Sequence, residues 1–129
     1  MAGDGSPLGG RTALVTGASR GIGRAVASAL AGAGARLMLI ARDTRQLTAA
    51  AREIDAALLP CDVRDRAALD RVIVSIAERT GGAPDILVNN AGLFELALVE
   101  ETDPTAFEAA LEVNLVAPFR LIRAFAPVM

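Results

Sequence analysis

Residues 11–23 read RTALVTGASRGIG, and this stretch decides the fold. A short apolar run ends at Thr16, a loop with glycines at 17, 21 and 23 follows, and a helical pattern covers residues 22–33. A strand, a glycine-rich turn and a helix in this order present free backbone N–H groups to a phosphate anion. An ordinary glycine-rich turn is the alternative interpretation of the glycines alone. A phosphate loop of nucleotide hydrolases is excluded because it needs a lysine, and the chain has none.

Apolar runs and helical patterns alternate along the rest of the chain. We expect the later strands and helices at residues 37–41, 44–54, 57–61, 66–80, 85–89 and 104–129. Asp43 or Thr44 caps the second helix and Asp65 the third, and Gly81-Gly82 ends the third. Such alternation predicts an α/β doubly wound parallel sheet with helices on both faces. Pro60 cannot donate to a ladder, so its strand lies at an edge and the predicted strand order is 3-2-1-4.

Composition narrows the classes of function. The 129 residues are the size of one domain, with a flexible lead-in expected over residues 1–10 and a single domain over 11–129. The net charge of −2 offers no basic excess for nucleic acid or an anionic membrane. No apolar run approaches the roughly 20 residues that span a bilayer. Histidine is absent and Cys61 is the single cysteine, so we expect no metal site and a reducing, cytoplasmic location. Cys61 itself is either a small buried residue at a strand end or a redox thiol.

Three further motifs follow the predicted strands. Asp62 follows the third strand, residues 89–92 read NNAG after the fourth, and Asn114 lies in a VNL triplet. Together with the Gly-x-x-x-Gly-x-Gly spacing of the first loop, they closely resemble the short-chain dehydrogenase/reductase family over residues 11–129. The resemblance implies a partial Rossmann-type sheet. It also implies hydride transfer between a nicotinamide cofactor and a small alcohol or carbonyl substrate.

The resemblance also implies a set of cofactor-binding residues. The first loop lines the pyrophosphate and adenosine ribose, and the Asp62 carboxylate accepts from the adenine amino group beside the Val63 backbone. The NNAG residues pack against the cofactor's ribose. The full expected set is Gly17, Ser19, Arg20, Gly21, Ile22, Gly23, Arg42, Asp62, Val63, Asn90, Ala91 and Gly92. As alternatives, Asp62 caps the loop that follows it, and Asn89-Asn90 is a turn pair that satisfies local backbone groups.

The end of the second strand bears on the choice of cofactor. A binder of unphosphorylated ribose places a carboxylate there, whereas this chain has Ala41 followed by Arg42. Arg20 reaches the same pocket from the glycine loop, and two guanidinium groups suit a 2′-phosphate. We therefore expect NADP(H) rather than NAD(H). The alternative is that Arg42 is solvated and Arg20 only borders the pyrophosphate.

Asn114 is the one catalytic residue that the resemblance implies, as the asparagine of an Asn-Ser-Tyr-Lys tetrad. Pro118 lacks an N–H, so the Asn114 carbonyl loses its helical partner and is free to hold a water in a proton relay. A helix-surface asparagine is the alternative. The family's serine and Tyr-x-x-x-Lys motif would follow later, but tyrosine and lysine are absent.

We therefore expect a chain that is truncated on its C-terminal side, lacks the last strands and is inactive alone. The resemblance implies a homo-oligomeric full-length parent. The rival interpretation is a non-catalytic nucleotide-binding or interaction protein that derives from the same fold.

Overall fold

The computed structural model describes residues 5–129. One parallel sheet contains β1 (Thr12–Thr16), β2 (Arg36–Ala41), β3 (Ala57–Pro60) and β4 (Ile86–Val88), in the order β3-β2-β1-β4. The predicted strand order is thus confirmed. Pro60 pairs with Ala41 at the end of the edge strand, where its missing N–H disturbs no inner ladder.

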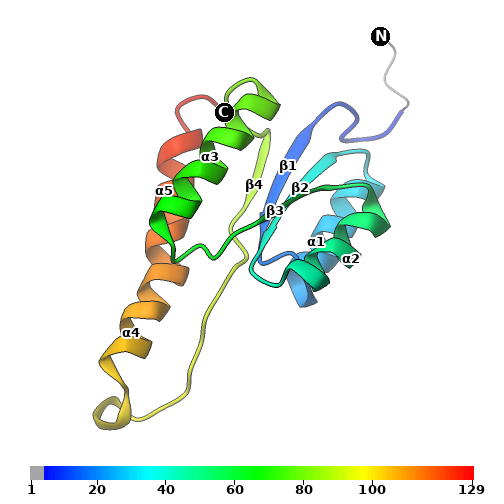
Figure 1. Ribbon diagram of the computed structural model, residues 1–129. Helices are drawn as coiled ribbons and strands as arrows, with labels where there is room; N and C mark the ends of the chain where they lie inside the picture. The colour runs from blue at the N-terminus through cyan, green and yellow to red at the C-terminus, as the bar shows by residue number, and fades with distance from the viewer. Residues whose placement is uncertain (1–4) are drawn as a thin grey trace.

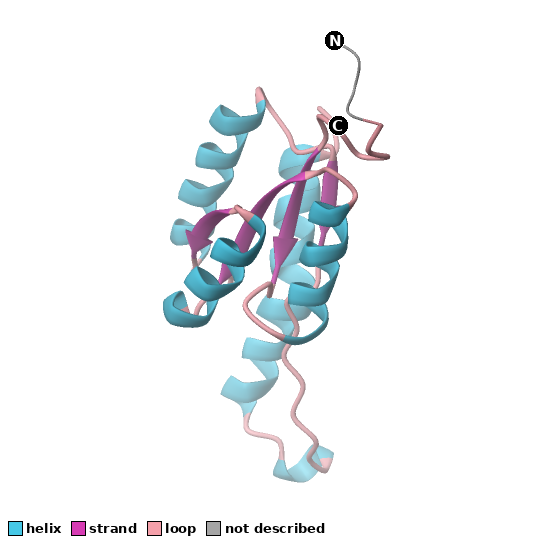
Figure 2. Cartoon of the chain, turned by 90° about the vertical axis from the view of Figure 1, so that its right-hand side faces the viewer, coloured by secondary structure: helices cyan, strands magenta, loops and turns pink. Residues whose placement is uncertain are grey.

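Helices cover both faces of the sheet (Figures 1 and 2). α1 (Gly21–Gly32) and α2 (Thr44–Ile54) lie on one face, and α3 (Arg66–Thr80) and α5 (Ala117–Phe125) lie on the other. Successive side chains of a strand point to opposite faces, so Ala13 and Val15 join the core under α1 and α2, while Leu14 joins the core under α3 and α5. All three are fully buried, as expected for a parallel sheet that is covered twice.

The predicted helix caps are present. The Asp43 carboxylate accepts from the Gln46 N–H at 2.9 Å, and the Asp65 carboxylate accepts from the Ala68 N–H at 2.9 Å. Each bond satisfies a backbone donor that the first helical turn leaves unpaired. Asp43 therefore begins α2 directly after β2, which places the start of this helix beside the end of that strand.

The C-terminal helical segment predicted over roughly 104–129 is present from Pro104 to Phe125, and its hydrogen-bond pattern changes before Pro118. After a short turn, η1 (Val99–Glu101), it divides into α4 (Pro104–Leu111), one π-helical turn, η2 (Glu112–Val116), and α5. The Ala117 N–H donates to the Glu112 carbonyl, five residues back. Pro118 supplies no N–H and its ring crowds the turn before it, which accounts for the widened turn. The helix ends at Phe125 because Pro127, two residues on, supplies no N–H to continue it.

The structure describes only residues 5–10 of the lead-in that is expected to be flexible over residues 1–10. Residues 1–4 lie outside the described residues. Residues 7–10 lie in a turn, and the Gly9 N–H donates to the Ser6 carbonyl at 3.1 Å. The Leu8 N–H donates to the Ala33 carbonyl at 2.8 Å, and the partly buried Leu8 side chain packs against the core under α1 and α2. These contacts attach this part of the lead-in to the domain, and its flexibility stays a prediction.

Candidate functional site

The carboxyl ends of all four strands surround one open cavity of about 680 Å³. Parallel α/β sheets bind their ligands at this edge. The cavity is lined by every residue of the predicted cofactor set except Gly23. It is also lined by Ile40, Ala41, Asp43, Gln46, Cys61, Arg64, Leu93 and Val113.

The glycine loop forms one wall of the cavity. Gly21 has a φ of +58°, and a Cβ added there would meet nothing within 4 Å, so a ligand can approach the backbone where α1 begins. Gly23 is different, because its Cβ would lie 2.3 Å from the Gly17 carbonyl oxygen. Gly23 thus belongs to the support of the loop rather than to its surface, which explains why it does not line the cavity.

Asn90 ties the glycine loop to the end of β4. Its side-chain Nδ2 donates to the carbonyl oxygens of Thr16 and Gly17, both at 3.1 Å. The Thr16 hydroxyl in turn accepts from the N–H groups of Asn90 and Ala91, at 3.0 and 2.9 Å. The Asn90 side chain therefore satisfies backbone groups of the distant glycine loop rather than of its own turn. Asn90 lines the cavity as well.

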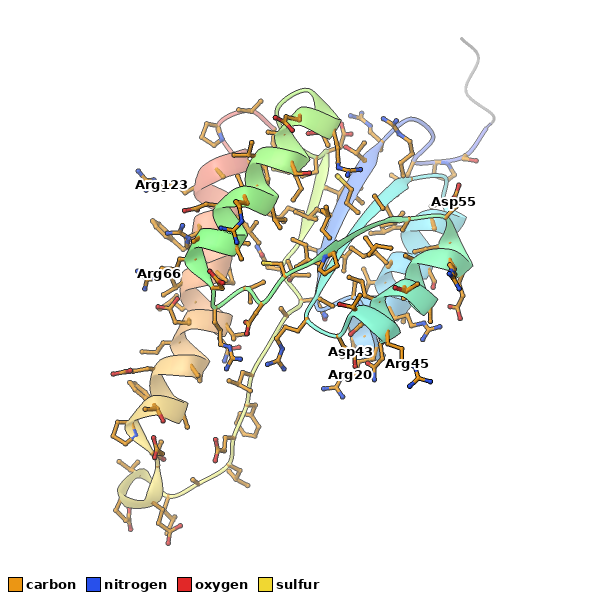
Figure 3. All side chains as sticks on the ribbon, viewed as in Figure 1. Arg20, Asp43, Arg45, Asp55, Arg66 and Arg123 are labelled. Carbon is orange, nitrogen blue, oxygen red and sulfur yellow. The ribbon has the colours of Figure 1, made fainter. Side chains whose placement is uncertain are left out.

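The end of β2 presents cations to the cavity. Ala41 is buried, and the exposed side chains of Arg42 and Arg20 both line the cavity. Asp43 also lines it, with one carboxylate oxygen occupied by the α2 cap. Figure 3 labels Arg20 and Asp43 where α1 and α2 begin. The two arginines expected at this end of the sheet therefore both line one cavity.

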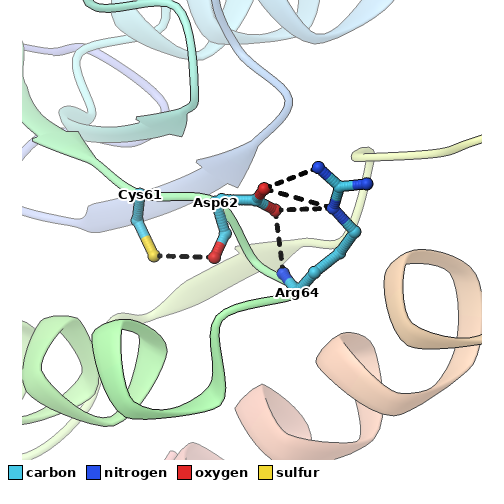
Figure 4. A network of polar contacts seen from close by, with 3 residues as sticks. All are labelled: Cys61, Asp62 and Arg64. Carbon is cyan, nitrogen blue, oxygen red and sulfur yellow. Dashed lines mark hydrogen bonds and ion pairs between the residues drawn. The ribbon is translucent and has the colours of Figure 1, made fainter. Parts of the chain in front are cut away.

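Asp62 lies at the end of β3 and is engaged by Arg64 (Figure 4). The Arg64 backbone N–H donates to Asp62 Oδ1 at 3.0 Å, and the Arg64 guanidinium contacts both carboxylate oxygens at 2.8 to 3.1 Å. The Arg64 side chain holds the pKa of the Asp62 carboxyl below its usual value. Burial raises the pKa of the neighbouring Cys61 thiol, which disfavours the thiolate that redox chemistry needs.

Asn114 lies in the π-helical turn and does not line the cavity. Its side-chain amide pairs with the backbone of Leu93, which does line it: Nδ2 donates to the Leu93 carbonyl at 2.7 Å, and Oδ1 accepts from the Leu93 N–H at 2.8 Å. Asn114 thereby fixes the loop that follows β4. Both polar atoms of the Asn114 side chain are therefore engaged by the Leu93 backbone.

The notion that Leu93, Phe94 and Leu96 either edge a cleft or cover the core is met for Leu93, which lines the cavity. The wall residues that sequence reasoning missed include Gln46, Arg64 and Val113. Arg64 lies two residues after Asp62, and Gln46 lies three residues after Asp43, so proximity to a predicted site residue was a usable signal for both. No comparable signal marks Val113, since its place depends on how η2 packs on the sheet.

Within residues 5–129, no helix combines the length and the apolar character that crossing a bilayer requires. The same range contains no group of three or more histidine, cysteine, aspartate or glutamate side chains placed to hold a metal ion.

Comparison with known proteins identifies the family. The family model for short chain dehydrogenase matches residues 11–129. Sorbitol dehydrogenase of Cereibacter sphaeroides is 38% identical over 124 residues, which are 95% of this chain and 48% of that protein.

Solved structures agree with this assignment. A metagenomic short-chain oxidoreductase in complex with NADP matches with a TM-score of 0.89 and 41% identity, over 95% of this chain and 57% of that one. L-Sorbose reductase of Gluconobacter frateurii, complexed with NADPH and L-sorbose, matches with a TM-score of 0.86 and 33% identity. The match covers 95% of this chain and 48% of that one. The chain spans about half the length of the sorbitol dehydrogenase and of the L-sorbose reductase. By its fold, its glycine loop and these matches, the chain belongs to the short-chain dehydrogenase family.

Proposed function

We propose that this chain forms the dinucleotide-binding part of an oxidoreductase that transfers hydride between NADP(H) and a small alcohol or carbonyl compound. The observation that carries the proposal is the cavity at the carboxyl edge of the sheet, with the start of α1 in its wall. When bound, the nicotinamide cofactor supplies or accepts the hydride. The residues of this chain bind and orient it.

The cavity wall suits a dinucleotide. At Gly21 the backbone is open to the cavity, and the first N–H groups of α1 suit the negative charge of a pyrophosphate. We assign Gly17, Ser19 and Ile22 to the same end of the cofactor, and Asn90, Ala91 and Gly92 to its ribose. The Asp62 carboxylate and the Val63 backbone then face the adenine.

The preference for NADP(H) follows from charge. Arg20 and Arg42 line the cavity, and the residue at the end of β2 is Ala41 rather than an acid. Asp43 is the nearest acid in sequence, and one of its carboxylate oxygens serves the α2 cap. Two similar solved proteins hold NADP or NADPH, which supports the same choice.

We assign Asn114 a role in proton relay through its backbone carbonyl, supported by the π-helical turn and by Pro118, which supplies no N–H. The chain contains no tyrosine, lysine or histidine to act as the proton donor. Turnover by the 129 residues alone is therefore not expected.

Three attributes of the whole protein remain proposals. A homo-oligomer is supported by exposed apolar side chains on the C-terminal helices, such as Phe119. A small alcohol or carbonyl substrate is supported by relatives that are named for sorbitol and L-sorbose. A cytoplasmic location is supported by the single, free and buried thiol of Cys61.

Calorimetric titration of NADPH and NADH into the chain, at fixed salt, tests the proposal. NADPH should bind more tightly, and Arg42→Ala should weaken NADPH binding by roughly 1.5–3 kcal/mol, the scale of hydrogen bonds to charged groups, while NADH binding changes little. Arg45→Ala is the matched control, because Arg45 is an exposed arginine at the start of α2 and does not line the cavity. Equal losses for both cofactors, or tighter binding of NADH by the unmodified chain, would contradict the assignment.

A further inference from the structure

The ion pair of Asp62 and Arg64 occupies the part of the cavity assigned above to adenine. Asp62 Oδ1 accepts from the backbone N–H of Arg64 at 3.0 Å and from its Nε at 3.1 Å, and Oδ2 accepts from Nε at 3.1 Å and from Nη2 at 2.8 Å. A carboxylate has about four lone-pair positions. The four contacts from Arg64 thus leave the carboxylate without a vacant position for a ligand donor.

The two kinds of contact differ in how easily they can be given up. The backbone N–H of Arg64 is fixed by the turn that joins β3 to α3, so it anchors Oδ1 whatever the side chain does. The guanidinium is on a flexible, exposed side chain, and 38% of the Arg64 side chain and 33% of the Asp62 side chain are accessible. Ion pairs of this exposure contribute little net free energy, so a ligand can displace the guanidinium while the carboxylate keeps its orientation.

We propose that the Arg64 side chain is a specificity-determining group that reduces the preference of this site for adenine over hypoxanthine, an inference that rests on the proposed dinucleotide function. An adenine amino group must take the place of the guanidinium before it can donate to Asp62. A hypoxanthine carbonyl oxygen at the same position would be repelled by the carboxylate alone, but Arg64 supplies a donor to it. The pair therefore offers an acceptor or a donor, depending on the base that enters.

The test compares NADPH with reduced nicotinamide hypoxanthine dinucleotide phosphate, in which a keto oxygen replaces the adenine amino group. Both are titrated calorimetrically into the 129-residue chain, into Arg64→Ala and into Arg45→Ala. In Arg64→Ala the backbone N–H remains, so NADPH should bind as well as before or up to about fivefold more tightly, the scale of an exposed ion pair. Binding of the hypoxanthine analogue should weaken, and the ratio of the two affinities should rise by about fivefold or more.

The ratio separates this role from general effects of charge and folding. An effect of net charge alone would change the binding of both dinucleotides alike. Arg45→Ala removes one positive charge outside the cavity wall, measures that effect and should leave the ratio unchanged. Arg64→Lys keeps the charge but lacks the planar fork, and should give an intermediate ratio. A ratio in Arg64→Ala equal to that of the unmodified chain, or a parallel loss of both ligands, would overturn the inference while leaving the dinucleotide site standing. An unmodified chain that binds neither dinucleotide would overturn both.

Discussion

Two regions of the molecule differ in how far their apolar side chains are buried. One is the sheet with its glycine loop, and the other is the C-terminal helical segment. In β1 and β2 every residue but Arg36 is buried, and the loops at their ends are held by backbone and asparagine hydrogen bonds. In the segment from Phe94 to Met129, by contrast, most large apolar side chains are exposed, including Phe94 at 84%, Leu96 at 87% and Leu115 at 62%. α4 and the loop before it extend beyond the sheet (Figures 1 and 2).

Within the C-terminal segment, α5 is packed on the sheet and α4 is not. Ala117, Leu121 and Phe125 on α5 are buried against the sheet face that α3 also covers. Ion pairs of Arg66 with Glu112 and of Arg120 with Asp70 join this segment to α3. α5 is therefore part of the folded core, whereas α4 and the loop before it have little cover. The cavity at the carboxyl edge of the sheet thus lies in the well-packed part of the molecule.

Truncation of one leucine in each region should give the largest difference in the free energy of unfolding. Leu14→Ala removes a fully buried side chain from β1 and should lower the free energy of unfolding by about 3–4 kcal/mol. Leu115→Ala, at an exposed position of η2, should change it by less than about 0.5 kcal/mol. Urea denaturation followed by circular dichroism measures both. Equal losses would mean that the two regions do not differ in packing.

A methyl group added to the glycine loop should give the next largest effect. The Gly23→Ala Cβ would lie 2.3 Å from the Gly17 carbonyl oxygen and 2.4 Å from Asn90 Nδ2, so the loop must shift, at a cost of about 2–3 kcal/mol. NADPH binding should fall with it. Gly32→Ala, at the end of α1 with nothing within 4 Å of the new Cβ, is the matched control and should be neutral or slightly stabilising. Unchanged unfolding and NADPH binding in Gly23→Ala would show that the loop is not rigid.

The smallest expected effect concerns the joint between β4 and β1. The Asp85 carboxylate accepts from the Thr12 backbone N–H at 2.8 Å, from the Thr12 hydroxyl at 2.9 Å and from Arg11 at 2.9 Å. These bonds, that of the Thr12 N–H above all, lower the pKa of Asp85 from 3.8 to about 2. Because the folded-state pKa is the lower one, the stabilisation is complete above pH 3.8 and is lost as the pH falls toward 2.

Acid unfolding of Asp85→Asn measures the stabilisation that the ionised Asp85 carboxylate supplies. The variant should be less stable than the unmodified chain near neutral pH, and the difference should shrink as the pH falls through that interval. Asp55→Asn removes a carboxylate at an exposed, left-handed position that asparagine also accepts, and should show no such convergence. A constant difference for Asp85→Asn at all pH values would contradict the assignment.

The sequence predicts the rigid region better than the exposed one. Pro60 marks the edge strand and Asp43 and Asp65 mark helix starts, because each depends on local backbone chemistry that neighbouring residues decide. The engagement of Asp62 by Arg64 was missed, because a long side chain has several local partners to choose from. At Pro118 the sequence predicts the loss of one helical hydrogen bond, but not the π-helical turn that divides the last helix. Asn114 and Leu93 are 21 positions apart in the sequence. The loop between them has no periodic pattern from which their contact could be predicted.

Amide hydrogen exchange with and without NADPH tests most directly the claim that the rigid sheet edge holds the dinucleotide. NADPH should slow exchange in residues 17–23, 61–64 and 90–92, which surround the cavity. Exchange in α4, residues 104–111, should be fast and unchanged by the cofactor. Slowing confined to α4, or no slowing in the glycine loop at saturating NADPH, would contradict the account.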